Sequence, residues 1–182
     1  HLTFEPEEYN KYFVLKQDAD GNRIPDAEVG RDLREHEAHR FMCVGKMFLR
    51  SQLDCEDDAV RNDKKVFDLK TRATLPIRLD VGNHSDYVSY TITRKTGIYN
   101  SFEREYYDMC RSAFLKYSFQ CRIGDMGGVF VAYHNTRELF GFEYIPLQRM
   151  DVALYGDSDK ADFVYRQSLH LSEKLLDRIV AD

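Results

Sequence analysis

The sequence predicts an α/β (α+β) domain with a central mixed β-sheet flanked by helices. Strand-like alternation, helical apolar spacing and short apolar runs support this prediction. In chain order these patterns cover residues 46–55, 66–73, 102–121, 128–136 and 139–145. With 182 residues, 43% of them hydrophobic, the chain can bury one full core. We therefore expect a single domain over residues 1–182.

Residues 1–25 are polar and are expected to form an N-terminal extension. The next segment, residues 26–41, allows two interpretations. It could form a helix that offers Glu35 or Glu37, or a short helix that runs into a strand pairing across Gly45. Because the chain begins with His rather than Met, it is expected to be a piece of a longer protein.

Two alternating segments carry the polar residues of most interest. In KMFLRSQLDC, Arg50, Gln52 and Asp54 share one face of the expected strand. In VFDLKTRA, Asp68 and Lys70 project together, because successive strand side chains point to opposite faces. A hairpin of these strands would bring both carboxylates and the ammonium together, providing oxygen ligands for Mg²⁺ and a charge for a reacting phosphate. The alternative is an ordinary surface ion pair.

The other face of the second strand, with Phe67, Leu69 and Ala73, is expected to pack inward. TLPIRLDV is expected to continue the sheet, and residues 87–102 to form a further hairpin.

One helix is expected over residues 102–121, with apolar side chains along one face. After the glycines at 124, 127 and 128 come two apolar strands, then a short helix from residue 146. An amphipathic helix is expected over residues 162–180.

Four sequence blocks resemble the fungal mitochondrial petite-one-two-seven family: RSQLDC, VFDLKTRATLPIR, SFEREYYDMCRSAFLKYS and VAYHNTRELFGFEYI. That family is implicated in processing and decay of mitochondrial RNA from the 5′ end and is assigned to the PD-(D/E)xK nuclease superfamily. The resemblance implies a restriction-endonuclease-like core. It also implies Asp54 as the acid of the first motif, and Asp68 with Lys70 as the second. Mg²⁺ or Mn²⁺ would be held by Asp54, Asp68 and the backbone carbonyl of Leu69.

Further residues are candidates for contacting the substrate. Gln52 shares the strand face of Asp54, and Arg72 shares that of Asp68 and Lys70, where it could hold a phosphate bidentately or pair with an acid. In related nucleases the helix after the metal strands borders the active site. The polar residues that fit this role here are Arg104, Tyr107 and Arg111, on one helical side. A solvated face knitted by ion pairs is the alternative.

The resemblance implies a metal-dependent, 5′ to 3′ exoribonuclease in mitochondria. Single-stranded RNA would be its substrate, and the mitochondrial RNA polymerase or expression machinery a possible partner. Such nucleases usually carry a Glu on a helix ahead of the sheet; here it is Glu35, Glu37 or a residue outside the chain. The alternatives are an inactive nuclease fold that binds RNA or a partner protein, and a DNA-directed nuclease of the same fold.

Composition narrows these choices. The formal net charge of −5 argues against binding nucleic acid by bulk electrostatics, although a local basic groove could still do so. No apolar run approaches the roughly 18 residues of a membrane span. The four cysteines show no paired spacing, which favours reduced thiols over a zinc site.

Overall fold

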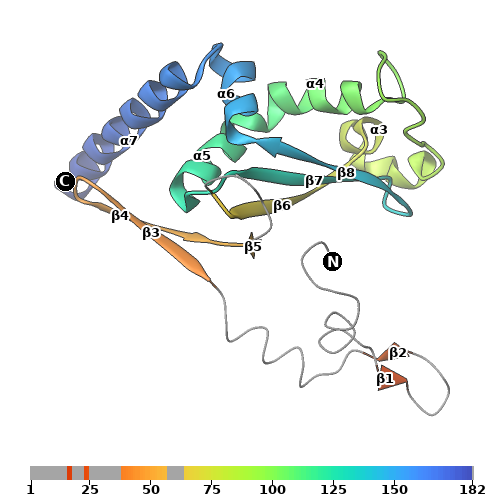
Figure 1. Ribbon diagram of the computed structural model, residues 1–182, viewed down its shortest axis with the longest axis horizontal. Helices are drawn as coiled ribbons and strands as arrows, with labels where there is room; N and C mark the ends of the chain where they lie inside the picture. Colours follow the sequence, from red (N-terminus) through yellow and green to blue (C-terminus); the bar gives the residue numbers. More distant parts are fainter. Residues whose placement is uncertain (1–15, 18–22, 25–37, 57–63, 182) are drawn as a thin grey trace.

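The computed structural model describes residues 16–17, 23–24, 38–56 and 64–181 (Figure 1). The elements are, in chain order, β1 (Lys16–Gln17), β2 (Arg23–Ile24), β3 (His39–Val44), β4 (Met47–Gln52), β5 (Cys55–Glu56), β6 (Val66–Ala73), α3 (Leu75–Leu79), η1 (Val81–Tyr87), α4 (Phe102–Ser112), α5 (Phe114–Gly124), β7 (Gly128–His134), β8 (Leu139–Pro146), α6 (Leu147–Tyr155) and α7 (Ser158–Ala181). Among these residues, no helix combines the length and apolar character of a membrane span.

The main sheet has four strands in the order β5-β6-β7-β8. β6 and β7 are parallel, while β5 and β8 pair antiparallel to them, so the sheet is mixed as predicted. A parallel pair needs a crossover, and the segment containing α3, η1, α4 and α5 provides it. Figure 1 shows α4, α5 and α6 on one side of the sheet. The expected strands at 128–136 and 139–145 and the short helix from 146 are confirmed.

The core lies between the sheet and the helices on that side. β7 contributes Val129, Val131 and Tyr133, which are fully buried against helix residues such as Met109 and Phe114. The register places Asp68 beside Val129 and Lys70 beside Val131. The polar side chains of β6 therefore face the helices.

The opposite face of β6 carries its apolar residues. Phe67 is buried and packs edge to face on Phe130, with 4.8 Å between ring centroids. Leu69 was expected to pack inward, but 49% of its surface is exposed. The prediction was wrong for Leu69, because the helices cover the other face of the sheet (Figure 1).

A hairpin precedes the main sheet. β3 and β4 pair antiparallel around Gly45 and Lys46, and Gly45 has a positive φ of 54°, which glycine adopts readily. The strand of the second alternative is thus confirmed as β3. The helix with which each alternative begins, including Glu35 and Glu37, lies outside the described residues. The predicted pairing of β4 with β6 was wrong, because β3 takes the edge of β4 and the short β5 pairs with β6 instead.

The far end of α7 reaches the turn of this hairpin (Figure 1). The Lys46 backbone N–H donates to Glu173 Oε1 at 2.6 Å, and Lys46 Nζ lies 2.9 Å from Asp177 Oδ2. α7 begins at residue 158, earlier than the predicted 162, because Asp157 Oδ1 accepts from the Lys160 N–H and caps the helix.

Two predictions between β6 and α4 were wrong. TLPIRLDV does not continue the sheet: it forms α3 and the start of η1, with Pro76 in the first turn of α3, where its missing N–H costs nothing. Residues 87–102 form no hairpin. Instead the Asn135 side chain donates to the carbonyls of Val88 and Tyr90, at 2.8 and 3.1 Å, and holds this segment as a loop.

The single helix expected over residues 102–121 is two helices. The helix is interrupted at Ala113, whose φ and ψ are −128° and −30°. Just before the break, Ser112 Oγ donates to the carbonyl of Asp108 at 2.7 Å, a contact that competes with the helical backbone pattern. The break lets α5 lie against β3, β4 and β7 while α4 packs on α5 and α6.

Gly128 is expected to be essential for the close pairing of the start of β7 with the end of β8. A Cβ atom there would meet two backbone positions, the Ile145 carbonyl oxygen and Pro146 Cα, the latter at 2.8 Å. We expect Gly128→Ala to lower the free energy of unfolding by about 1–3 kcal/mol in urea denaturation. Gly82→Ala is the control, because nothing lies within 4 Å of its added Cβ, and its effect should stay within about 0.5 kcal/mol. Equal losses for both variants would contradict this account.

Candidate functional site

Asp54, Asp68 and Lys70 converge beside the first half of β6. Asp54 follows β4, and its Oδ2 accepts a hydrogen bond from the Leu69 backbone N–H at 3.1 Å. Asp68 is fully buried, and its Oδ2 forms an ion pair with Lys70 Nζ. The Lys70 side chain is 20% exposed, and its ammonium also lies 5.7 Å from the centre of the Tyr117 ring on α5. The predicted proximity of the three residues is confirmed, although β5 rather than a β4–β6 hairpin produces it.

The two carboxyl groups influence each other strongly. Burial, followed by a hydrogen bond with Asp54, raises the pKa of Asp68 from 3.8 to about 6, and Lys70 opposes this rise. The same hydrogen bond lowers the pKa of Asp54, and the Leu69 N–H and Lys70 add to the lowering, against desolvation. A carboxyl pair with diverging pKa values next to an ammonium is typical of functional sites.

The donor set suits a hard divalent cation. Asp68 Oδ1 is buried and has no hydrogen-bond donor within the described part of the chain. Strain, a catalytic role, a bound water or a bound ion can account for such an atom, and a cation is the explanation that suits two neighbouring carboxyl groups. No group of three or more His, Cys, Asp or Glu side chains that could hold a metal occurs among the described residues. Mg²⁺ commonly uses one or two carboxylates and takes its other ligands from water and substrate phosphate, so two carboxylates are sufficient.

The backbone carbonyl of Leu69 is the third predicted ligand, and the strand pairing gives its direction. The pairing of β5 with β6 ends at Cys55 and Phe67, so Leu69 lies just beyond it, and its N–H is directed to Asp54 instead. Because the N–H and C=O of one strand residue point to the same edge, the Leu69 carbonyl lies on the edge of β6 that Asp54 occupies. The predicted three-ligand set of Asp54, Asp68 and Leu69 therefore fits the geometry.

The Lys70 side chain lines a groove of about 750 Å³ between β4 and α5. Its walls are formed by Arg50, Ser51, Lys70, Leu115, Lys116, Phe119, Gln120 and Ile123. Sequence reasoning missed the α5 residues in this groove. The one signal in the sequence was the four-residue spacing of Lys116 and Gln120, which places them on the same side of a helix.

Gln52, a predicted substrate contact, lies on the exposed face of β4 and does not line the groove. Its backbone carbonyl accepts a hydrogen bond from Ser51 Oγ at 3.3 Å.

Arg72 lies on the same face of β6 as Asp68 and Lys70, but its guanidinium is engaged by acids of α4. Its Nη2 is 2.7 Å from Asp108 Oδ2, its Nε is 3.8 Å from Glu105 Oε2, and only 6% of the residue is exposed. Arg78 completes the network with bonds to Asp108 and, at 2.9 Å, to Glu105. Of the two roles that the sequence allowed Arg72, the structure shows the pairing with acids.

Arg72 is therefore expected to stabilise the fold. We expect Arg72→Ala to lower the free energy of unfolding by about 1–3 kcal/mol, because it removes the buried hydrogen bonds of the guanidinium and leaves Arg78 as the remaining cationic partner of Glu105 and Asp108. Urea denaturation measures this loss, and Arg94→Ala, at an exposed position, is the control. If Arg72→Ala unfolded like wild type but bound RNA weakly, Arg72 would be a phosphate ligand instead.

The α4 residues predicted to touch the substrate gather around Tyr107. Arg104 and Arg111 lie 6.0 and 5.6 Å from its ring centre, and Arg111 Nη1 donates to its hydroxyl at 3.2 Å. They share one side of the helix as expected, but none of the three lines the groove that contains Lys70. Arg104 instead borders a separate cavity of about 410 Å³ beside α3 and η1.

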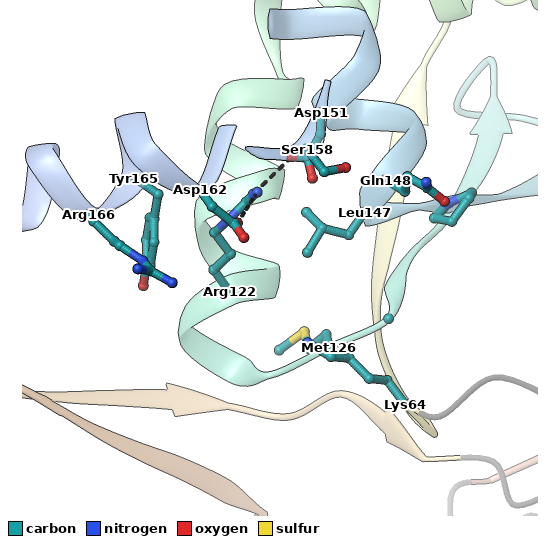
Figure 2. Close-up of a pocket in the computed structure, with 12 residues that line it drawn as sticks. Lys64, Arg122, Met126, Leu147, Gln148, Asp151, Ser158, Asp162, Tyr165 and Arg166 are labelled. Carbon is teal, nitrogen blue, oxygen red and sulfur yellow. Dashed lines mark hydrogen bonds and ion pairs between the residues drawn. The ribbon is translucent and has the colours of Figure 1, made fainter. Parts of the chain in front are cut away.

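A second large cavity, of about 740 Å³, lies among α5, α6 and α7 (Figure 2). Figure 2 shows the Arg122 side chain directed toward Asp151 and Asp162, from which its Nη atoms lie 2.9 and 2.8 Å. Arg122 lies on α5, Asp151 on α6 and Asp162 on α7, so these ion pairs link three helices. The Arg122 side chain is 8% exposed. None of Asp54, Asp68 and Lys70 lines this cavity, which is separate from the acid and lysine cluster.

Comparison with known proteins places the chain in a family. A family model described as "Mitochondrial protein Pet127" matches residues 1–180. The "mRNA degradation protein pet127, mitochondrial" of Schizosaccharomyces pombe is 49% identical over 130 residues, which cover 71% of this chain and 25% of that protein. PET127 of Saccharomyces cerevisiae is 43% identical over 142 residues, covering 75% of this chain and 18% of the relative.

The chain thus spans a quarter or less of the length of these two relatives. The match nevertheless covers nearly all of its own residues, including the segments that carry Asp54, Asp68 and Lys70. The chain belongs to the Pet127 family of mitochondrial proteins.

Proposed function

We propose that this chain carries the active site of a metal-dependent ribonuclease of the PD-(D/E)xK type, acting 5′ to 3′ in mitochondrial RNA processing and decay. One observation carries the proposal: Asp54 and Asp68 come from separate segments and meet at β6, beside the ammonium of Lys70. The mixed sheet with helices on one side agrees with such a core. The name of the Schizosaccharomyces pombe relative, an mRNA degradation protein, supports RNA as the substrate.

The residues of the chain have distinct parts in this proposal. Asp54, Asp68 and the Leu69 carbonyl would hold Mg²⁺ or Mn²⁺. When bound, the cation supplies Lewis-acid chemistry, polarising the phosphate and lowering the pKa of a water molecule. Asp68 must give up its proton to serve as a ligand, and its raised pKa of about 6 still leaves it ionised at neutral pH.

Lys70 would stabilise the negative charge that develops on the phosphate during cleavage. Its ammonium is held in place by Asp68 and by the Tyr117 ring, so little reorganisation is needed when the charge appears. Partial burial strengthens the effect, since the field of an ammonium is less screened away from bulk water.

The test is cleavage of 5′-monophosphorylated single-stranded RNA by the full-length protein with Mg²⁺ or Mn²⁺, with single-stranded DNA in parallel. Loss of RNA that requires the metal and disappears in Asp54→Asn would support the proposal. Preference for DNA would favour a DNA-directed nuclease. Folded protein that binds RNA but never cleaves it would favour an inactive binding module. Association with the mitochondrial RNA polymerase or expression machinery stays a separate prediction.

A further inference from the structure

The groove beside Lys70 has two unlike walls. β4 contributes Arg50 and Ser51, while α5 contributes Lys116, Phe119 and Gln120 together with apolar side chains. Its volume of about 750 Å³ is within the range of about 300–1,000 Å³ for pockets that bind small organic ligands. The groove is therefore large enough for a nucleotide.

The charge of the groove differs from that of the whole chain. Its lining includes Arg50, Lys70 and Lys116 and no acidic side chain, although the chain has a net charge of −5. Arg50 and Lys116 are exposed, and neither makes an ion pair within the part of the chain that the structure describes. Cations without acidic partners beside a phosphodiester site suit backbone phosphates.

Phe119 gives the groove an aromatic surface. Its ring packs edge to face on Tyr165 of α7, with centroids 5.1 Å apart and planes at 88°. Tyr165 is itself buried, so its contact fixes the position of the Phe119 ring, which remains partly exposed in the groove. A fixed, partly exposed aromatic ring is the platform on which proteins stack unpaired bases.

We infer that this groove is a nucleotide subsite for single-stranded RNA, next to the phosphate to be cleaved. Arg50 and Lys116 would contact the RNA backbone, Phe119 would stack with a base, and Gln120 would offer its amide to the base edge. A single strand is required because a base within a duplex has no free face. The inference rests on the proposed function, since it takes its position from Lys70.

The two kinds of contact predict different salt dependence. Each phosphate contact contributes about −0.7 to the slope of log K against log salt for single strands. In the full-length protein we expect Lys116→Ala to weaken binding of a short RNA about five- to tenfold at low salt and to make that slope shallower by about 0.7. Phe119→Leu should weaken binding similarly but leave the slope unchanged, because stacking releases no counterions.

Fluorescence anisotropy without divalent cations measures these effects while preventing metal-dependent cleavage. Matched controls lie on α7, outside the groove: Lys174→Ala and Phe163→Leu, both at exposed positions. Lys116→Arg should retain the wild-type slope and Phe119→Tyr the wild-type affinity, which separates loss of contact from disturbed folding. A slope change equal in Lys116→Ala and Lys174→Ala would overturn the inference.

Cleavage measured in parallel separates this inference from the proposed function. If the wild type cleaves RNA through Lys70 while Lys116→Ala and Phe119→Leu bind RNA normally, the subsite is wrong and the nuclease stands. If the wild type binds RNA with the expected dependence on both residues but never cleaves it, the subsite stands and the nuclease is wrong.

Discussion

Replacing Lys70 with Met is expected to slow RNA cleavage by about 100- to 1,000-fold without unfolding the protein. This is the range seen when an active site loses one fixed donor that stabilises developing charge. Met keeps most of the side-chain volume of Lys while removing the ammonium, which lies beside Asp68 and 5.7 Å from the centre of the Tyr117 ring. The rate should be measured in single turnover with saturating RNA and Mg²⁺, so that it reports the chemical step.

Two companion variants sharpen this prediction. Lys70→Arg keeps the positive charge but changes its shape, so it should recover part of the rate if charge alone matters. Lys174→Met, at an exposed position on α7, removes a lysine far along the chain and should cleave like wild type. Near-normal cleavage by folded Lys70→Met would remove Lys70 from the mechanism.

The sequence predicted best those features that depend on neighbouring residues. Alternation along β6 was enough to place Asp68 and Lys70 on one face, and the apolar runs were enough to locate β7 and β8. The nearness of Asp54 to Asp68 was also predictable, because a short connection between adjacent strands limits how far apart they can lie.

The loop between β6 and α4 could not be predicted in this way. Its strand-like composition is overridden by Asn135, far away in the sequence, which binds the Val88 and Tyr90 carbonyls. Arg72 shows the same limitation. Its position on β6 equally suits a phosphate or an acid, and only the packing of α4 brings Asp108 within 2.7 Å.

The groove residues illustrate a third limit. Lys116 and Phe119 line a groove only because β4 supplies the other wall, which contains Arg50. That arrangement depends on the break at Ala113, which sets the direction of α5. Because apolar spacing continues through the break, the sequence favoured one straight helix. The predicted substrate contacts were therefore placed on the part that forms α4.

Replacing Asp68 with Asn is expected to reduce cleavage about 1,000-fold or more and, in the absence of metal, to stabilise the protein at neutral pH. The loss of cleavage is expected because the proposed metal site would lose a charged ligand, an effect of several kcal/mol on the transition state. The gain in stability follows from the pKa of Asp68, which burial and Asp54 raise from 3.8 to about 6.

The direction of the pH effect is fixed by proton binding. Between pH 3.8 and about 6 the folded chain keeps on Asp68 a proton that the unfolded chain has lost. The free energy of unfolding therefore falls as pH rises through this interval and stays lower above it. Asn resembles the protonated acid at every pH, so Asp68→Asn avoids this loss, worth about 1–3 kcal/mol. The lowered pKa of Asp54 offsets part of it.

Urea denaturation without divalent cations should therefore show Asp68→Asn more stable than wild type at pH 7.5, with the difference shrinking toward pH 4. Asp86→Asn, at an exposed position, should show no such trend. Adding Mg²⁺ should stabilise the wild type but not Asp68→Asn, because the proposed site needs both carboxylates to bind the ion and forms only in the folded chain. If Asp68→Asn were the less stable protein at every pH, the ion pair with Lys70 would outweigh the burial of Asp68, and the carboxylate would hold the fold together. If Asp68→Asn were more stable than wild type without Mg²⁺ but less stable with it, Asp68 would be a charge that is retained for function although it destabilises the fold.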